Sequence, residues 1–500
     1  MSPSCLNFAV VFVSGNDTAG KGSCVPGRAA HNITETTDMD TEILSRLQFA
    51  FTISFHYIYP PLSIGLGLII VIMEGLYLKT GKKMYEDMTR FWIRIFALVF
   101  GLGVATGIIM EFEFGTNWAT YSRYVGDIFG SALAAEGIFA FALESGFLGI
   151  LLFGWKRVSP KVHFFSALMV FLGSLFSAVW IVVANSWQQT PSGFHIVGEG
   201  MQARAEITDF WQMVFNPSSV DRLLHVWTGA FLAGAFLVMS VNAWYILKKK
   251  HLEIAKPSFR IALAVGIVFS LAQLFLGHRS AEGVAKNQPA KMAAMEGHFD
   301  STGAADMYIL GWVSKKEQHT AGIRIPGGLS FLLHGDFNAP VTGLNAFAAD
   351  TTPPQVNAVF QFYHLMVAIG IALIILTLYA AWQWRRGKLF DKKWLMIVFV
   401  WAVLLPQIAN QAGWFAAEMG RQPWVVYGLL RTSDALSATV KAEQVLTSLI
   451  LFTLVYATLF VLFLYLLNKK IKHGPVLQAA AAEEAATSRR QNPFMNTSSQ

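Results

Sequence analysis

The sequence predicts an all-α integral membrane protein with nine transmembrane helices, its N-terminus outside and its C-terminus in the cytoplasm. Three observations support this prediction. Of the 500 residues, 54% are hydrophobic and only 14% are charged, a balance typical of membrane proteins. Apolar runs of about 20 residues, the length that crosses a bilayer as a helix, recur along the chain. Lysine and arginine cluster in every second segment between these runs, as they do in cytoplasmic loops.

The apolar runs define nine predicted spans. They lie near residues 48–78, 91–111, 128–153, 163–186, 222–247, 259–277, 355–384, 394–415 and 446–468. Basic clusters such as Lys248, Lys249 and Lys250 follow the first, third, fifth, seventh and ninth spans. Because these clusters mark the cytoplasmic side, the long segment 278–354 is expected to face outward. Loops of this length are usually functional or disordered.

The two ends of the chain differ from the rest. Residues 1–38 are rich in Gly, Ser and Thr, and their short apolar run lacks the basic flank of a signal peptide. We expect this extension to be disordered or absent from the mature chain, with Met39 as an alternative start. Residues 39–475 would form the membrane domain, and 476–500 a disordered cytoplasmic tail.

Cysteine usage and charge exclude two classes of site. The only cysteines are Cys5 and Cys24, so neither a disulfide framework nor a Cys-based metal site can occupy the membrane domain. The net charge of +7 lies in short clusters between apolar runs rather than in a basic groove. Nucleic acid is therefore not an expected partner.

Ionisable side chains at membrane depth are costly and are functional candidates by default. The stretch WFAAEMGRQPW, residues 414–424, carries Glu418 and Arg421 between tryptophans. Histidines at 56, 225 and 364 also lie in predicted spans, where a histidine either bonds a neighbouring helix or ligates haem iron. Met366 is two residues from His364, about 200° around a helix. A His225–Met366 pair and a His225–His364 pair both remain open.

Polar residues in the third and fourth spans are spaced alike. Glu136 and Glu144 lie about 12 Å apart along a helix, with Ser145 adjacent, and Ser177 and Asn185 repeat the interval. These rows predict either a proton relay or a set of interhelical hydrogen bonds.

A short helix is predicted in the outward segment. In KNQPAKMAAMEGHF, residues 286–299, Pro289 can begin it and Gly297 can end it. This helix would carry Lys291 and Glu296 near the membrane surface.

Several long motifs resemble one known family. WFAAEMGRQPW, SRLQFAFTISFHYIYPPL, MEFEFGTNW and GDIFGSALAAEGIFAFALES resemble subunit I of the cytochrome bd-type quinol oxidases, over about residues 39–472. The resemblance implies a terminal oxidase of the bacterial cytoplasmic (inner) membrane. It would oxidise membrane ubiquinol or menaquinol, reduce O2 to water and build a proton gradient without pumping. It further implies a second large membrane subunit and a small single-span accessory peptide.

The resemblance also implies cofactors and residue roles. Two haem b and one haem d are expected, with a third haem b as the alternative because the outward loop is of the family's shorter kind. One departure concerns His364, which stands where some members carry arginine. Matching motifs assign His225 and Met366 to the low-spin haem b iron, His56 and Glu418 to the two high-spin haem irons, and Trp414 to the space between those haems. They assign Arg421 to a propionate or to charge compensation, Lys291 and Glu296 to quinol oxidation, and Glu136, Glu144, Ser145 and Ser177 to proton uptake.

Two other functions are alternatives to a quinol oxidase. An ion or solute transporter would explain the buried acids, but it predicts inverted repeats, and the sequence has no clear repeat. A haem-bearing membrane anchor without oxygen chemistry would share the haem ligands, and oxygen uptake with a reduced quinol distinguishes it.

Overall fold

The computed structural model describes residues 41–476, and within that range it contains the nine predicted membrane helices. Their bounds lie within a few residues of the predicted ones for most spans, but the sixth helix continues to Asn287, well past its predicted end. The predictions for residues 1–38 and for the tail beyond 476 lie outside the described residues. The spans are Thr41–Thr80, Lys83–Thr116, Gly126–Phe153, Pro160–Gln189, Ser219–Leu247, Leu252–Asn287, Val356–Arg385, Lys393–Met419 and Ala442–His473.

Prolines interrupt two of these spans. The first consists of α2 (Thr41–His56) and α3 (Tyr59–Thr80), and the eighth of α15 (Lys393–Trp401) and α16 (Leu404–Met419). A proline ring clashes with the carbonyl four residues before it. Pro60 thus ends α2 at His56, and Pro406 breaks the chain at Ala402. Both breaks lie beside segments that carry candidate ligands.

The other long helices are continuous except for the third span. There a single π-helical turn, residues 136–141, separates two α-helical segments. The bundle contains α4 (Lys83–Thr116), α6 (Gly126–Ala135), α7 (Ala142–Phe153), α8 (Pro160–Gln189), α10 (Ser219–Leu247), α11 (Leu252–Asn287), α14 (Val356–Arg385) and α17 (Ala442–His473), with the short α5 (Ala119–Tyr124) and α9 (Phe210–Val214) between spans.

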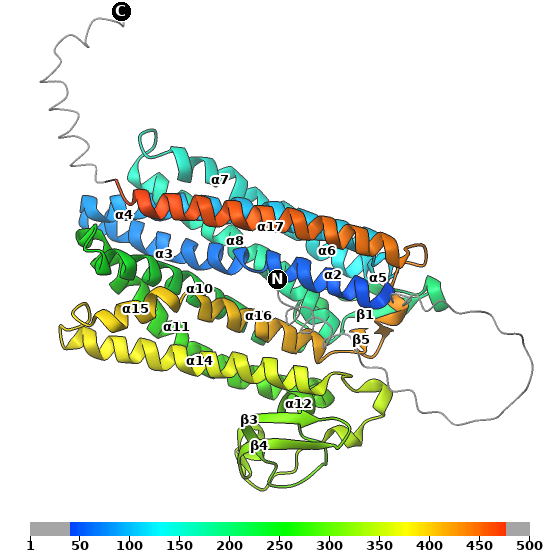
Figure 1. Cartoon of the computed structure of the whole chain (residues 1–500). Helices are drawn as coiled ribbons and strands as arrows, with labels where there is room; N and C mark the ends of the chain where they lie inside the picture. The colour runs from blue at the N-terminus through cyan, green and yellow to red at the C-terminus, as the bar shows by residue number, and fades with distance from the viewer. Residues whose placement is uncertain (1–40, 477–500) are drawn as a thin grey trace, which may run out of the picture.

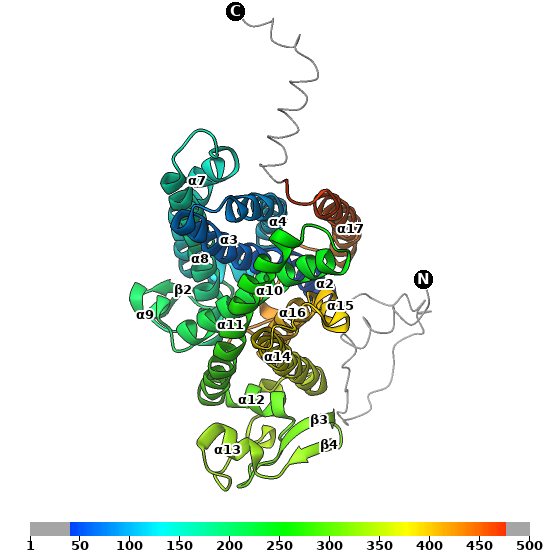
Figure 2. The same ribbon diagram turned by 90° about the vertical axis from the view of Figure 1, so that its left-hand side faces the viewer.

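Helix α10 forms the centre of the bundle (Figure 2). Of its most apolar stretch 89% is buried, against 11% for α17 at the periphery. It crosses α3 where two glycines meet: a Cβ on Gly65 would lie 2.6 Å from the nitrogen of Gly234. Small residues at such a crossing allow the two backbones to approach closely, and this contact fixes α3 against the core.

Three two-stranded antiparallel hairpins lie outside the spans. Two of them, β1 (Phe194–Val197) with β2 (Arg204–Ile207) and β5 (Trp424–Val426) with β6 (Leu430–Arg431), lie at the end of the bundle opposite the C-terminal end of α17 (Figure 1). The segment 278–354 is ordered: it contains α12 (Pro289–Glu296), β3 (Met307–Ser314), β4 (His319–Ile325) and α13 (Gly328–His334). The predicted short helix is confirmed, with Gly297 at its C-cap in the left-handed region.

The crossing of α3 and α10 gives a test of the packing. We expect Gly65→Ala to destabilise the protein by about 1–3 kcal/mol or more, because the added methyl meets backbone atoms that cannot yield. Thermal unfolding followed by fluorescence-detected gel filtration measures the loss. Gly101→Ala on α4 is the matched control, since a Cβ at that position meets nothing within 4 Å. Equal stability of the two variants would contradict the close crossing.

Candidate functional site

A buried network of charges surrounds Glu418 near the end of α16. Its Oε2 accepts a hydrogen bond from the guanidinium of Arg421. Its Oε1 accepts from Asn185 Nδ2 at 3.1 Å and from Gln189 Nε2 at 3.2 Å, both on α8. Arg421 is 5% exposed and also donates to Gln188 Oε1 at 3.2 Å. The predicted Glu418–Arg421 pair therefore exists and is bound to α8.

The same amides of α8 join two further cations to Glu418. Asn185 Oδ1 accepts from Arg222 of α10, and Gln189 Oε1 accepts from Lys291 Nζ of α12 at 2.8 Å. Residues 185, 188 and 189 project from one face of α8 because they are three and four positions apart. One face of one helix thus connects α10, α12 and α16.

Positive charge exceeds negative charge in this network. Among its described members, Arg222, Arg421 and Lys291 oppose the single carboxylate of Glu418. Burial lowers the pKa of the Lys291 ammonium well below its ordinary value, and the field of Arg222 lowers it further. Arg222 Nε is buried without a hydrogen-bond partner among the described residues. Uncompensated charge at low dielectric is unfavourable, so the network is suited to bind further anionic groups.

Lys291 and Glu296 lie on opposite sides of α12. Five positions on a helix correspond to about 140°. Lys291 therefore contacts the charge network, whereas Glu296 is hydrogen-bonded to Tyr363 of α14. Both side chains are buried within the protein, so neither is a solvated surface charge. Burial raises the pKa of Glu296 to about 7, and its Oε2 has no partner in the described chain.

His56 is oriented by a threonine. Its Nδ1 lies 2.9 Å from Thr106 Oγ1, whose hydroxyl proton is directed to the carbonyl of Leu102 at 2.8 Å. Thr106 therefore accepts from His56, which leaves the lone pair on Nε2, the form that binds a metal. One turn away, Thr52 donates to the buried Glu113 at 2.5 Å. Glu113 was not among the residues predicted from the sequence, although it lies in the MEFEFGTNW motif.

His364, the alternative to Met366 as the partner of His225, contacts backbone carbonyls. His364 Nδ1 lies 2.9 Å from the carbonyl of Phe360, and Nε2 lies 2.7 Å from the carbonyl of Tyr308. The His364 ring also stacks on Phe360, with centroids 3.9 Å apart. Both nitrogens face backbone carbonyls, and a neutral ring can donate to only one of them; this orientation favours Met366 over His364 as a ligand.

Each candidate ligand with a nitrogen or sulfur atom faces a glycine on another helix. A Cβ at Gly413 would lie 2.6 Å from Met366 Sδ, one at Gly277 3.8 Å from His225 Cε1, and one at Gly107 3.2 Å from His56 Cε1. His225 also lies 3.1 Å from Gln273 Nε2. The glycines therefore allow these side chains to pack close to the neighbouring helices.

The two acids of the third span face hydroxyls on α8. Ser177 donates to Glu136 at 2.5 Å and Ser174 donates to Glu144 at 2.6 Å. Eight residues of pure α-helix would turn the acids about 80° apart, and the extra residue of the π turn reduces the offset to about 20°. Ser145 points elsewhere, to the carbonyl of Phe141 at 2.7 Å. Ser174, the partner of Glu144, was therefore not predicted from the sequence.

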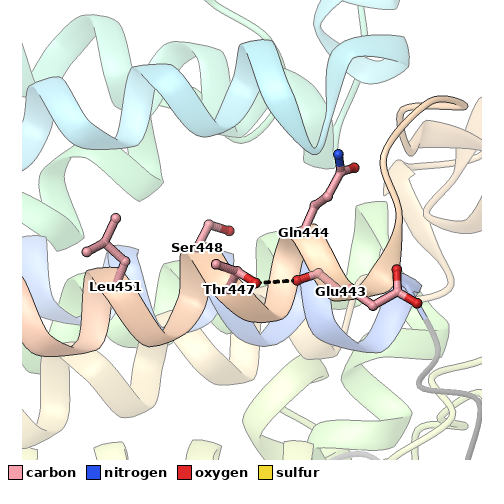
Figure 3. Close-up of a pocket in the computed structure, with 5 residues that line it drawn as sticks. All are labelled: Glu443, Gln444, Thr447, Ser448 and Leu451. Carbon is pink, nitrogen blue, oxygen red and sulfur yellow. Dashed lines mark hydrogen bonds between the residues drawn. The ribbon is translucent and has the colours of Figure 1, made fainter.

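Two further features complete the site. Trp414 of α16 packs against α2, with its ring centroid 6.3 Å from that of Phe49 and 5.4 Å from that of its neighbour Phe415. A separate open hollow lies along the first turns of α17 (Figure 3), and none of the candidate ligands lines it. Its lining residues are Glu443, Gln444, Thr447, Ser448 and Leu451.

These observations fit haem. Among residues 41–476, no three His, Cys, Asp or Glu side chains gather to hold a metal ion, and the candidate ligands stand singly, as axial ligands do. The surplus of buried cations matches the negative propionates that each haem carries. Indole N–H groups of Trp180 and Trp227 are also buried without a partner in the described residues.

Comparison with known proteins decides the family. The model for cytochrome bd terminal oxidase subunit I matches residues 44–475. The chain belongs to this family. It is 38% identical over 446 residues to cytochrome bd ubiquinol oxidase subunit 1 of Bacillus subtilis, covering 87% of this chain and 94% of that protein. It is 36% identical to cytochrome bd-II ubiquinol oxidase subunit 1 of Escherichia coli, with 86% and 96% covered.

A solved structure agrees with these relatives. The bd oxidase from Geobacillus thermodenitrificans matches with a TM-score of 0.81 and 29% identity, over 87% of this chain and 99% of that chain. Family membership confirms three predictions from the sequence: the all-α membrane fold with nine spans, the terminal-oxidase activity, and the location in the bacterial inner membrane. It does not test the individual site residues, which remain predictions.

Proposed function

We propose that the protein oxidises a membrane quinol at Glu296 and passes the electrons to haems held by His56, His225, Met366 and Glu418, where O2 is reduced to water. Two haem b and one haem d, or a third haem b, would supply the electron relay and the oxygen-binding iron. The observation that carries this proposal is the buried network around Glu418, in which positive charge exceeds negative charge.

His225 and Met366 would hold the low-spin haem b, and His56 and Glu418 the two high-spin haems. The single hydrogen bond of His56 Nδ1 to Thr106 supports a ligand role for its other nitrogen. Glu418 would compensate a ferric charge. Arg421 and Arg222 would bind propionates, because a guanidinium matches a carboxylate in shape and charge. Trp414 would lie between the high-spin haems.

Glu296 and Lys291 would act at different places. Quinol oxidation releases two protons, and a carboxylate within reach of the hydroxyl accepts one of them. The unpartnered Oε2 of Glu296 suits this role, and Tyr363 positions the carboxylate from α14. The substrate would be ubiquinol or menaquinol. Lys291 would compensate charge beside Glu418 through Gln189 rather than contact the quinol hydroxyl.

Protons for oxygen reduction would enter from the cytoplasmic side along the third and fourth spans. Glu144 with Ser174, followed by Glu136 with Ser177, forms two carboxyl–hydroxyl steps on facing helices. Ser145 would contribute from the exposed side of α7. With the N-terminus outside, quinol protons would leave on one side and consumed protons arrive from the other, so charge separates without a pump.

A second large membrane subunit would cover one face of the bundle. Glu111 is exposed on α4 within an apolar span, where contact with lipid is costly. Phe112 on α4 and Ile138 and Phe139 in the third span are 59–67% exposed. Figure 2 shows α4, α7 and α17 together on this side of the molecule. A small single-span peptide would complete the complex.

Oxygen uptake tests the function directly. The purified complex is expected to consume O2 when given a reduced short-chain quinol, and a pyridine haemochrome analysis should count b-type and d-type haems. Glu418→Ala should remove oxygen uptake and perturb a high-spin haem while the low-spin signal persists, because one iron ligand is lost. An unchanged high-spin spectrum in this variant would refute the assignment, and a complex without any haem signal would refute the function.

The low-spin haem distinguishes the two ligand pairs. We expect His364→Ala to retain the low-spin spectrum, since both nitrogens of this ring face backbone carbonyls. Met366→Leu, a change of nearly equal volume, should lose or shift it. Reduced-minus-oxidised difference spectra of the two variants make the comparison. Loss of the low-spin signal in His364→Ala would instead support ligation by two histidines.

The pH profile tests Glu296 as the base. Its pKa is raised to about 7, so the carboxyl is protonated and inactive as a base below that pH. We expect kcat/KM for quinol to rise as pH increases through 7, and Glu296→Gln to lose about 100-fold or more. The hydrogen bond from Tyr363 lowers the pKa of Glu296, so Tyr363→Phe should move the profile to higher pH. A Tyr363→Phe profile identical to that of the unmodified enzyme would contradict this arrangement.

A further inference from the structure

The β3–β4 hairpin exposes an apolar face. Leu310 is paired with Ile323 and Trp312 with Ala321 across the hairpin, and directly paired residues share one face of a sheet. Leu310 and Ile323 are each 63% exposed and Trp312 is 67% exposed. A contiguous cluster of large apolar side chains on an exposed hairpin marks an interaction surface.

The opposite face of the hairpin is fastened to α14 by three polar side chains. They occupy one stripe of that helix and reach the backbone of β3. Val313 N donates to Asn357 Oδ1 at 3.0 Å, Gln361 Nε2 donates to the carbonyl of Gly311 at 2.7 Å, and His364 Nε2 lies 2.7 Å from the carbonyl of Tyr308.

The stripe on α14 continues past the hairpin as bare apolar surface. Positions 357, 361, 364, 368, 371 and 375 repeat every three or four residues and so share one side of the helix. Ile371 and Ile375 are 49% and 63% exposed, as expected for side chains that face lipid in a membrane span. Figures 1 and 2 show the hairpin beside the first turns of α14, lateral to the bundle rather than across its end. It therefore lies against the side of the helix that faces lipid.

The hairpin is oriented with its charged turn away from the centre of the span. The turn carries Lys315, Lys316 and Glu317 and lies near the start of α14, where Lys315 Nζ donates to the carbonyl of Pro353 at 3.3 Å. Leu310 and Ile323 lie nearer His364, further into the span. On this face the apolar residues thus lie further into the span than Trp312 and the lysines of the turn, the order typical of membrane-interface segments. Arg324 follows Ile323 and alternates to the other face, where it pairs with Asp306.

We propose that the face formed by Leu310, Trp312, Ala321 and Ile323 lies in the outer leaflet of the bilayer, so that segment 278–354 is anchored in lipid beside α14. The occupant of this surface is the acyl-chain and headgroup boundary rather than water or a protein. The anchor reaches α12, because Thr320 Oγ1 donates to the carbonyl of Gly297 at 2.7 Å. The hairpin thereby fixes the helix that ends at Glu296 relative to the membrane.

Site-directed spin labelling of the intact oxidase in lipid nanodiscs tests the proposal. With Cys5 and Cys24 replaced by Ser, single labels are placed at Leu310→Cys and Ile323→Cys. Glu317→Cys in the turn is the matched control for water, and Ile371→Cys on α14 is the control for lipid. Collision rates with O2, which partitions into lipid, and with a water-soluble nickel chelate give the depth of each label.

We expect the labels at 310 and 323 to lie about 5–10 Å below the headgroup boundary, with oxygen contact like that at 371 and little nickel contact. The label at 317 should show the reverse. Nickel contact at 310 and 323 equal to that at 317 would overturn the proposal, because the face would then be in water. Exclusion of both reagents would also overturn it, because a protein partner would then cover the face. Retained haem spectra in each variant establish that the fold is intact.

Discussion

Buried positive charge at the C-terminal end of α8 is the constraint on which the site depends. Three cations from different parts of the chain donate to side-chain amides of α8. Arg222 and Lys291 donate to Asn185 and Gln189, which themselves donate to Glu418, and Arg421 donates to Gln188. Removing such groups from water costs several kcal/mol per ion unless pairing and hydrogen bonds compensate. The two guanidinium groups alone exceed the single carboxylate, so this end of the bundle is most stable when anionic groups are bound there.

Local departures from regular helical geometry orient the polar side chains of the site. Pro60 ends α2 at His56, so the chain does not continue from this candidate ligand as a straight helix. The π turn at residues 136–141 aligns Glu136 with Glu144 against α8. In each case a small backbone irregularity reorients a polar side chain that a regular helix would direct to lipid or to the wrong neighbour. Such irregularities are frequent at functional positions in helices.

The sequence predicted the features that depend on local composition. Span number and the capped helix α12 follow from apolar runs and from Pro and Gly at fixed offsets, and the structure confirms both. Side-chain partners from distant parts of the chain could not be predicted in this way. Ser145 was selected because it adjoins Glu144, yet the serine that contacts this acid is Ser174, thirty positions away. Nothing local to His364 indicates that the carbonyl of Tyr308 binds its ring. The separation of Lys291 from Glu296, by contrast, follows from helical geometry alone.

Helix α8 connects the two parts of the site without forming a complete path. Ser174, Ser177, Asn185 and Gln188 all lie on one stripe, because their spacings are multiples of three and four. The stripe is interrupted at Ile181, which leaves about 12 Å between Ser177 and Asn185. A single hydrogen bond spans about 3 Å, so protons cannot pass from Glu136 to the Glu418 network along α8 alone. Transfer across this interval requires ordered water or a bound group with its own acidic oxygens, and either would make proton delivery to the outer site depend on occupancy of the space between α8 and its neighbours.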